Sequence, residues 1–104
     1  MNIRQLKYML EIAKEGSITD AANNLYISQP SLSKLLSSVE KKIGAKLFDR
    51  STKPMTLTYA GEKYINAASK IIAILNELQH EIDDIQQSVV GSLKIGCGTN
   101  YSPI

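Results

Sequence analysis

Cysteine is nearly absent from this 104-residue sequence, and long apolar runs are missing. The single cysteine, Cys97, excludes an intramolecular disulfide and an all-cysteine zinc site, and it favours a reducing compartment. No apolar stretch approaches the roughly 18 residues that a membrane-spanning helix needs, and the polar start Met1-Asn-Ile-Arg-Gln is unlike a signal peptide. We therefore expect a cytoplasmic protein that does not enter a membrane.

Side chains suited to catalysis or metal binding are also scarce. The only histidine, His80, stands between Gln79 and Glu81, and no second metal ligand is suitably placed beside it. No nucleophile, base and orienting group occur in a recognisable arrangement. We expect no enzymatic activity, no metal site and no cofactor.

Charge is distributed unevenly, although the net charge is only +2. Residues 1–58 contain nine Lys or Arg against five Asp or Glu, whereas residues 59–104 contain three against five. The apolar fraction of 43% is ordinary for a globular chain. A basic segment joined to a mildly acidic one is typical of nucleic-acid binding.

Three amphipathic helices are predicted within the first 45 residues. Ser17 and Ser28 can cap the second and third helices, with Asp20 in a capping-box position after Ser17, and Gly16 and Gly44 can end the first and third. The apolar residues recur at steps of three and four: Ile3, Leu6, Met9, Leu10 and Ala13 in the first helix, Ala21, Ala22 and Leu25 in the second, and Leu32, Leu35, Leu36, Val39 and Ile43 in the third.

The second and third helices are separated by only two or three residues, which is typical of a helix-turn-helix. Hydroxyl, amide and cationic groups, which can bind base edges and phosphates, gather in the exposed first turn of the third helix. Tyr26 stands where many such proteins have glycine. A plain three-helix core with a polar capping turn is the alternative interpretation. The candidate DNA-binding residues of this turn are Ser28, Gln29, Pro30, Ser31, Ser33 and Lys34.

A small β-hairpin is predicted next. The segments 46–50 and 55–58 alternate partly in polarity around the turn Ser51-Thr52-Lys53-Pro54. Arg50 and Lys53 would lie on this wing and could contact the DNA backbone or the minor groove. A solvated loop with two charges is the alternative, but a basic wing after a helix-turn-helix favours DNA binding.

A long helix is predicted over residues 59–89, with Thr58 as its cap. Its apolar residues alternate at steps of four and three as far as Val89, a heptad repeat that indicates a coiled coil with a second chain. The candidate dimerisation residues are Tyr64, Ala68, Ile71, Leu75, Leu78, Ile82 and Ile85. Residues 90–104 are predicted to form a hinge and a short strand, Ser92–Ile95, as the first strand of an absent domain.

Five motifs together resemble the LysR-type transcriptional regulators. They are Arg4-Gln-Leu-Lys-Tyr, Gly16-Ser-Ile-Thr-Asp-Ala-Ala, Leu25-Tyr-Ile-Ser-Gln-Pro-Ser-Leu-Ser-Lys, Leu47-Phe-Asp-Arg and Leu57-Thr-Tyr-Ala-Gly. The resemblance also extends to Gly91-Ser-Leu-Lys-Ile-Gly, which is similar to the start of that family's effector domain.

The resemblance implies a mainly α fold: a winged helix-turn-helix over residues 1–58 and a linker helix that pairs antiparallel in a homodimer. It also implies a periplasmic-binding-protein-like sensor domain, which this chain lacks and through which alone a small-molecule effector would act. Gln29, Pro30, Ser33 and Lys34 would face the major groove, Arg50 and Lys53 would make the wing's contacts, and Arg4, Ser17 and Thr19 would contact the DNA backbone. The family often has arginine where Lys34 and Lys53 stand, and lysine cannot form arginine's forked contact with guanine.

We therefore predict a bacterial transcription regulator's DNA-binding module that binds an inverted-repeat operator as a dimer. Whether full-length dimers assemble into tetramers is left open by the sequence. A protein-interaction module that recruits partners through its coiled coil is one rival, which the basic charge of residues 1–58 disfavours. A small-molecule sensor is another, but its pocket would lie in the absent domain.

Overall fold

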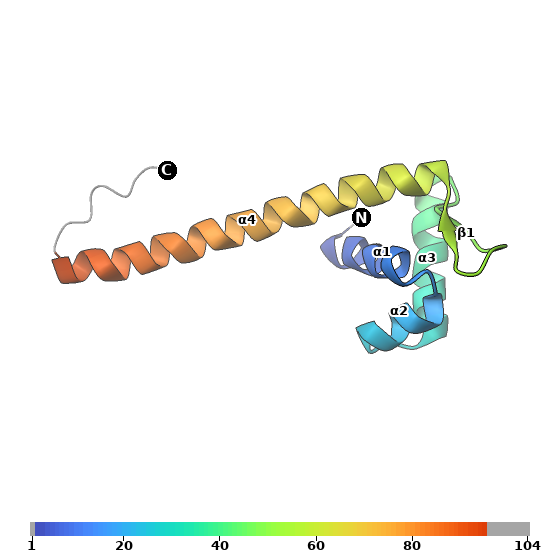
Figure 1. The fold of residues 1–104 in the computed structure, drawn as a ribbon, viewed down its shortest axis with the longest axis horizontal. Coiled ribbons are helices and arrows are strands. Elements are labelled where there is room, and N and C mark those ends of the chain that lie inside the picture. Colours follow the sequence, from blue (N-terminus) through green and yellow to red (C-terminus); the bar gives the residue numbers. More distant parts are fainter. Residues whose placement is uncertain (1, 96–104) are drawn as a thin grey trace. The chain divides into compact units, whose positions relative to one another are not determined.

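The structure, a computed structural model, describes residues 2–95 as four helices and one two-stranded hairpin (Figure 1). The elements are α1 (Ile3–Glu15), α2 (Ile18–Leu25), α3 (Gln29–Ile43), β1 (Phe48–Asp49), β2 (Thr56–Leu57) and α4 (Tyr59–Ile95). The chain divides into two compact units between Ile72 and Ala73. The predicted order of three helices, a hairpin and a long helix is confirmed.

The helix ends follow the predicted caps, with one exception. The Ser17 hydroxyl accepts a hydrogen bond from the Asp20 backbone N–H at 3.2 Å, but the reciprocal bond of a capping box is not formed. Aspartate is one methylene shorter than the glutamate that usually makes this bond. A capping box instead starts α1, where Asn2 and Gln5 each accept a hydrogen bond from the other's backbone N–H.

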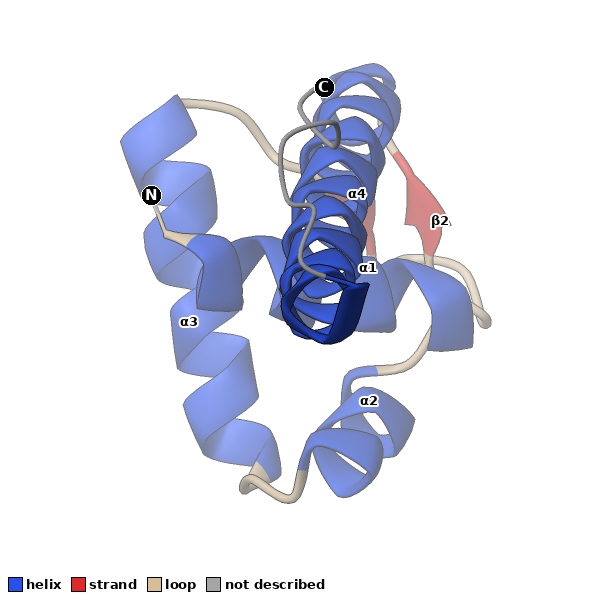
Figure 2. Ribbon diagram, turned by 90° about the vertical axis from the view of Figure 1, so that its left-hand side faces the viewer, coloured by secondary structure: helices blue, strands red, loops and turns tan. Residues whose placement is uncertain are grey.

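The core of the first unit lies among α1, α2 and α3, and Figure 2 shows α2 and α3 joined at an angle by their short turn. The beginning of α4 covers this core, because Ala60, Tyr64 and Ile65 pack against it. The buried residues of the cluster are Met9, Ile12, Ile18, Ala21, Ala22, Leu32, Leu36, Val39, Leu47 and Phe48. Six of these ten residues lie at positions that the apolar periodicity predicted, whereas Ile12 and Ile18 in the helices and Leu47 and Phe48 at the wing were not among them. Burial of one apolar face per helix accounts for the three-helix arrangement.

The wing's strands are shorter than predicted. Only two residues on each side pair, with Phe48 opposite Leu57 and Asp49 opposite Thr56. The backbone N–H of Met55 donates to the Gly16 carbonyl at 2.9 Å instead of to the hairpin. The wing is therefore held by the helical core as much as by its own ladder.

The start of α4 is fixed by Thr58 and Gly61. The Thr58 hydroxyl accepts from the Gly61 backbone N–H at 3.0 Å and donates to the Lys46 carbonyl at 2.6 Å, so it caps α4 and ties it to the segment before β1. A Cβ atom placed on Gly61 would lie 1.9 Å from the Leu47 carbonyl oxygen. Only glycine permits this approach of α4 to the chain before the wing.

The prediction that the long helix ends at residue 89 and that a strand follows at Ser92–Ile95 is wrong, since α4 continues to Ile95. An isolated strand leaves its backbone groups without partners, whereas a helix forms hydrogen bonds among its own backbone groups. The side chain of Val89, and residues 96–104 including Cys97, lie outside the described part of the structure. Within the described residues, none of the helices could span a membrane.

Candidate nucleic-acid interface

The first turns of α3 present the predicted polar side chains to solvent. Gln29 and Ser33 are four residues apart, as are Pro30 and Lys34, so these pairs lie on one face of the helix. The opposite face, which includes Leu32 and Leu36, is buried in the core. Of the six candidates, Ser28, Gln29, Pro30, Ser31 and Lys34 are exposed and Ser33 is half-buried.

The two serines at the start of α3 are engaged with each other. The Ser28 hydroxyl accepts from the Ser31 backbone N–H at 3.2 Å and donates to the Ser31 hydroxyl at 2.7 Å. Ser28 thus serves as the N-cap of α3, which explains its place in the sequence without a contact to DNA. The Ser31 hydroxyl can still donate its own proton.

The wing and the beginning of α2 enclose one cleft of about 440 Å³. It brings together four candidates that are far apart in the sequence: Ser17 and Thr19 on one side, Arg50 and Lys53 on the other. Thr52, which was not among the predicted contacts, also lines the cleft. Lys53 and Thr52 are exposed, so the cleft is open to a large ligand.

The electrostatics of this cleft favour an anion. The first amide groups of a helix lack partners within it and carry the positive end of the helix dipole. In α2 the Asp20 N–H donates to the Ser17 hydroxyl, and the backbone N–H groups of Ile18 and Thr19 lie at the N-terminus of the helix. The cations of Arg50 and Lys53 add to this positive potential, while the carboxylates of Glu15 and Asp20, which also line the cleft, oppose it.

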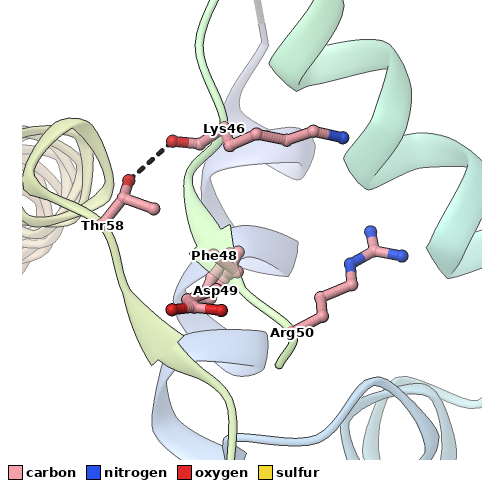
Figure 3. Close-up of a pocket in the computed structure, with 5 residues that line it drawn as sticks. All are labelled: Lys46, Phe48, Asp49, Arg50 and Thr58. Carbon is pink, nitrogen blue, oxygen red and sulfur yellow. Dashed lines mark hydrogen bonds between the residues drawn. The ribbon is translucent and has the colours of Figure 1, made fainter. Parts of the chain in front are cut away.

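Arg50 also borders a second hollow, of about 390 Å³, at the base of the wing. Figure 3 shows Lys46 and Arg50 extending to the same side of their segment, while Asp49 points elsewhere. The Asp49 carboxylate accepts from the Ser51 hydroxyl and from the Ser51 backbone N–H, and these two bonds lower the pKa of Asp49 below its ordinary value. Asp49 therefore shapes the turn that follows Arg50.

Arg4 is not brought into either hollow. It is exposed on the first turn of α1, and its guanidinium lies 5.5 Å from the centre of the Tyr8 ring. The structure thus groups the predicted backbone contacts Ser17 and Thr19 with the wing, and leaves Arg4 separate.

Glu40, near the end of α3, is a positioning residue that the sequence analysis missed. Its side chain is only 5% exposed, and it accepts hydrogen bonds from the backbone N–H groups of Leu47 at 2.8 Å and Phe48 at 3.4 Å. Its own carbonyl accepts from Gly44 and Ala45. One residue thus receives four N–H groups of the link between α3 and the wing. In the sequence, Glu40 stands between Val39 and Lys41, and no local pattern indicates that its carboxylate accepts backbone N–H groups of the wing.

The heptad seam of α4 belongs partly to the chain's own fold. Ala68 is only 1% exposed within the chain itself, so its assignment to the dimer surface is corrected. Tyr64 packs partly against the core, and burial raises the pKa of its hydroxyl. Heptad spacing cannot distinguish a side chain that packs within one chain from one that packs against a second. The remaining seam residues are exposed: Ile71, Leu75, Leu78, Ile82 and Ile85.

Comparisons with known proteins agree with this arrangement. The family described as "Bacterial regulatory helix-turn-helix protein, lysR family" matches residues 3–62. The HTH-type transcriptional regulator BsdA of Bacillus subtilis (strain 168) is 40% identical over 97 residues, which is 92% of this chain but only 33% of that protein.

Solved structures give the same result. The BenM_DBD/catB site 1 DNA complex superposes with a TM-score of 0.79 at 29% identity, covering 84% of this chain and 94% of the other. The CbnR_DBD–DNA complex superposes with a TM-score of 0.73 at 30% identity, covering 81% and 97%. The resemblance inferred from the motifs is confirmed: this chain belongs to the LysR family of bacterial regulatory helix-turn-helix proteins.

Proposed function

We propose that this chain is the DNA-binding and dimerisation part of a bacterial transcription regulator that acts in the cytoplasm and is not an enzyme. It binds double-stranded DNA as a homodimer, and its two recognition helices read the halves of an inverted repeat. The observation that carries the proposal is the cleft that joins Arg50 and Lys53 of the wing to the first turn of α2. Similar folds occur in BenM_DBD and CbnR_DBD bound to DNA.

The proposed mechanism divides the contacts between specificity and affinity. The first turns of α3 enter the major groove, where Gln29, Ser33 and Lys34 meet base edges and Pro30 packs against them. The cleft between α2 and the wing holds the sugar-phosphate backbone, with Ser17, Thr19, Arg50 and Lys53 as its contacts. Arg4 makes a separate backbone contact. These cations make the affinity salt-dependent.

The exposed seam of α4 supports the dimer. The apolar side chains of Ile71, Leu75, Leu78, Ile82 and Ile85 follow the heptad spacing and are each 38–50% exposed. A second α4 helix would bury this stripe and would fix the spacing of the two recognition helices. The chain spans about a third of the length of relatives such as BsdA, so effector binding would belong to the remainder of a longer protein.

Selection of DNA from a genomic library with the 104-residue chain tests the proposal. We expect enrichment of an inverted repeat and a binding constant that falls steeply with salt. Lys34→Ala should weaken operator binding by about 1–3 kcal/mol and should weaken binding to random DNA much less. Lys42→Ala, an exposed lysine in the last turn of the same helix, is the matched control and should retain the specificity ratio. Recovery of no preferred sequence would contradict the proposal.

A further inference from the structure

Tyr26 adopts a left-handed backbone conformation, which elsewhere in the described residues only glycines adopt. It follows α2 with φ 59° and ψ 40°, in the left-handed region. The helix ends with the same geometry at Gly16 and Gly44 avoid the steric cost that a side chain incurs there. Tyr26 is the one non-glycine residue with positive φ among those that the structure describes.

The side chain of Tyr26 does not stabilise the fold by packing. It is 94% exposed, the highest exposure among the large apolar and aromatic side chains of the described part. Its neighbours Leu25 and Ile27 pack against the core, so the chain turns inward on both sides of it and directs the ring into solvent. No side-chain hydrogen bond within the described residues involves its hydroxyl. A strained residue with a free side chain is most economically explained by a contact outside the chain.

The position of Tyr26 indicates what that contact is. The residue stands in the turn of the helix-turn-helix, two places before Ser28, the N-cap of α3. When the first turn of a recognition helix lies in the major groove, the turn that precedes it lies at the groove's edge, along the sugar-phosphate backbone. A phenol hydroxyl is a neutral donor that pairs well with a charged phosphate oxygen.

We propose that Tyr26 is a DNA-contact residue whose hydroxyl donates a hydrogen bond to a phosphate beside the major groove. The inference rests on the function proposed above, since it requires α3 to be the recognition helix. The contact raises the affinity for every DNA sequence and orients α3. The strained left-handed backbone of Tyr26 places the ring where it can make this contact.

Two substitutions separate the hydroxyl from the backbone strain. Tyr26→Phe keeps the ring and should lower affinity for the selected operator and for a random duplex alike, by about three- to tenfold, without changing Tm. Tyr26→Gly should also lower affinity but should raise Tm by about 4 °C, because glycine accepts the left-handed conformation. Neither variant removes a cation, so the dependence of affinity on salt should keep its slope.

Tyr59→Phe is the matched control. Tyr59 is also an exposed tyrosine, at 75%, but it begins α4 in ordinary helical geometry, and its substitution should change neither affinity nor Tm. Wild-type affinity of Tyr26→Phe would overturn the contact, and a loss confined to the operator would overturn its assignment to a phosphate. An unchanged or lower Tm of Tyr26→Gly would overturn the strain argument. Failure of the wild-type chain to bind any DNA would instead refute the proposed function.

Discussion

The carboxylate of Glu40 accepts the backbone N–H of Leu47 at 2.8 Å and so joins the recognition helix directly to the base of the wing. The ammonium of Lys46 lies 3.8 Å from the other carboxylate oxygen, which is too long for a hydrogen bond, and Lys46 is largely exposed. The backbone bonds therefore give Glu40 its importance, rather than the ion pair.

Glu40→Ala should lower the free energy of unfolding by about 3 kcal/mol, because it leaves the buried N–H groups of Leu47 and Phe48 without an acceptor. Glu40→Gln keeps one acceptor oxygen and should cost about 1 kcal/mol. Urea unfolding followed by circular dichroism measures both values. Glu77→Ala, on an exposed part of α4, is the control and should change stability by less than about 0.5 kcal/mol. Equal stability of Glu40→Ala and wild type would show that the wing is held by other contacts.

Gly61→Ala should destabilise the domain by about 2–4 kcal/mol, although alanine normally favours a helix over glycine. The reason is the 1.9 Å approach of the new Cβ to the Leu47 carbonyl oxygen. Gly44→Ala provides the comparison, since nothing lies within 4 Å of its Cβ and only the φ of +83° opposes the change, at about 1 kcal/mol. Thermal unfolding of both variants measures the difference. A smaller loss for Gly61→Ala than for Gly44→Ala would contradict the steric argument.

Lys53→Ala should weaken binding to operator and random DNA by similar factors and should reduce the slope of log K against log salt by about one. The wing's lysine faces the cleft, where a phosphate rather than a base edge is the expected partner. Fluorescence anisotropy at several salt concentrations provides the measurement. Lys70→Ala, on an exposed part of α4, should leave the slope unchanged. A loss restricted to the operator would mean that Lys53 reads a base.

Leu75→Asp combined with Leu78→Asp should convert the dimer to a monomer, because it places two charges in the exposed apolar seam. Sedimentation velocity measures the change from dimer to monomer. A circular-dichroism spectrum that keeps the helical signal expected for residues 1–72 would show that the first unit is still folded. Asn76→Asp with His80→Asp adds the same charge away from the seam and should remain dimeric. An intact dimer of the Leu75 and Leu78 variant would refute the seam as the interface.

Acid should loosen the turn after Arg50. Because hydrogen bonds from Ser51 lower the pKa of Asp49, its contribution to the fold is complete above the ordinary pKa of 3.8 and is lost as pH falls through the lower folded value. An NMR titration of the Asp49 carboxyl should therefore give a midpoint below 3.8, and Ser51→Ala should raise it. Ser38→Ala, on an exposed part of α3, should leave it unchanged. A midpoint at or above 3.8 in the wild type would contradict the two Ser51 bonds.

The sequence predicted the elements whose signals are local. Gly16 and Gly44 ended helices where the periodicity broke, Ser17 and Ser28 capped the next ones, and the apolar stripes identified six of the ten buried core residues. The wing's location was predictable from its turn residues, as was its basic character.

Features that depend on distant contacts were not predictable. The contacts of Glu40 with Leu47 and of Gly16 with Met55 join residues that no local sequence pattern connects. The shortness of the two strands and the burial of the Glu40 carboxylate were therefore not predicted. Ala68 has the spacing of a dimer contact, yet it is buried within its own chain. A heptad repeat does not specify which chain supplies the packing partner. Ser92–Ile95 alternates like a strand, but alternation without a neighbouring strand does not decide the backbone conformation.

The attachment of the wing to Gly16 and Glu40 has a consequence for folding. A hairpin with two-residue strands is too short to form alone, so it becomes ordered only after α1 and α3 have come together. Opening of the core would release the Met55 and Leu47 amides at the same time, and hydrogen exchange at these two positions should follow global unfolding. The DNA contacts proposed for the wing would therefore depend on an intact helical core, because the wing is ordered only while the core holds it.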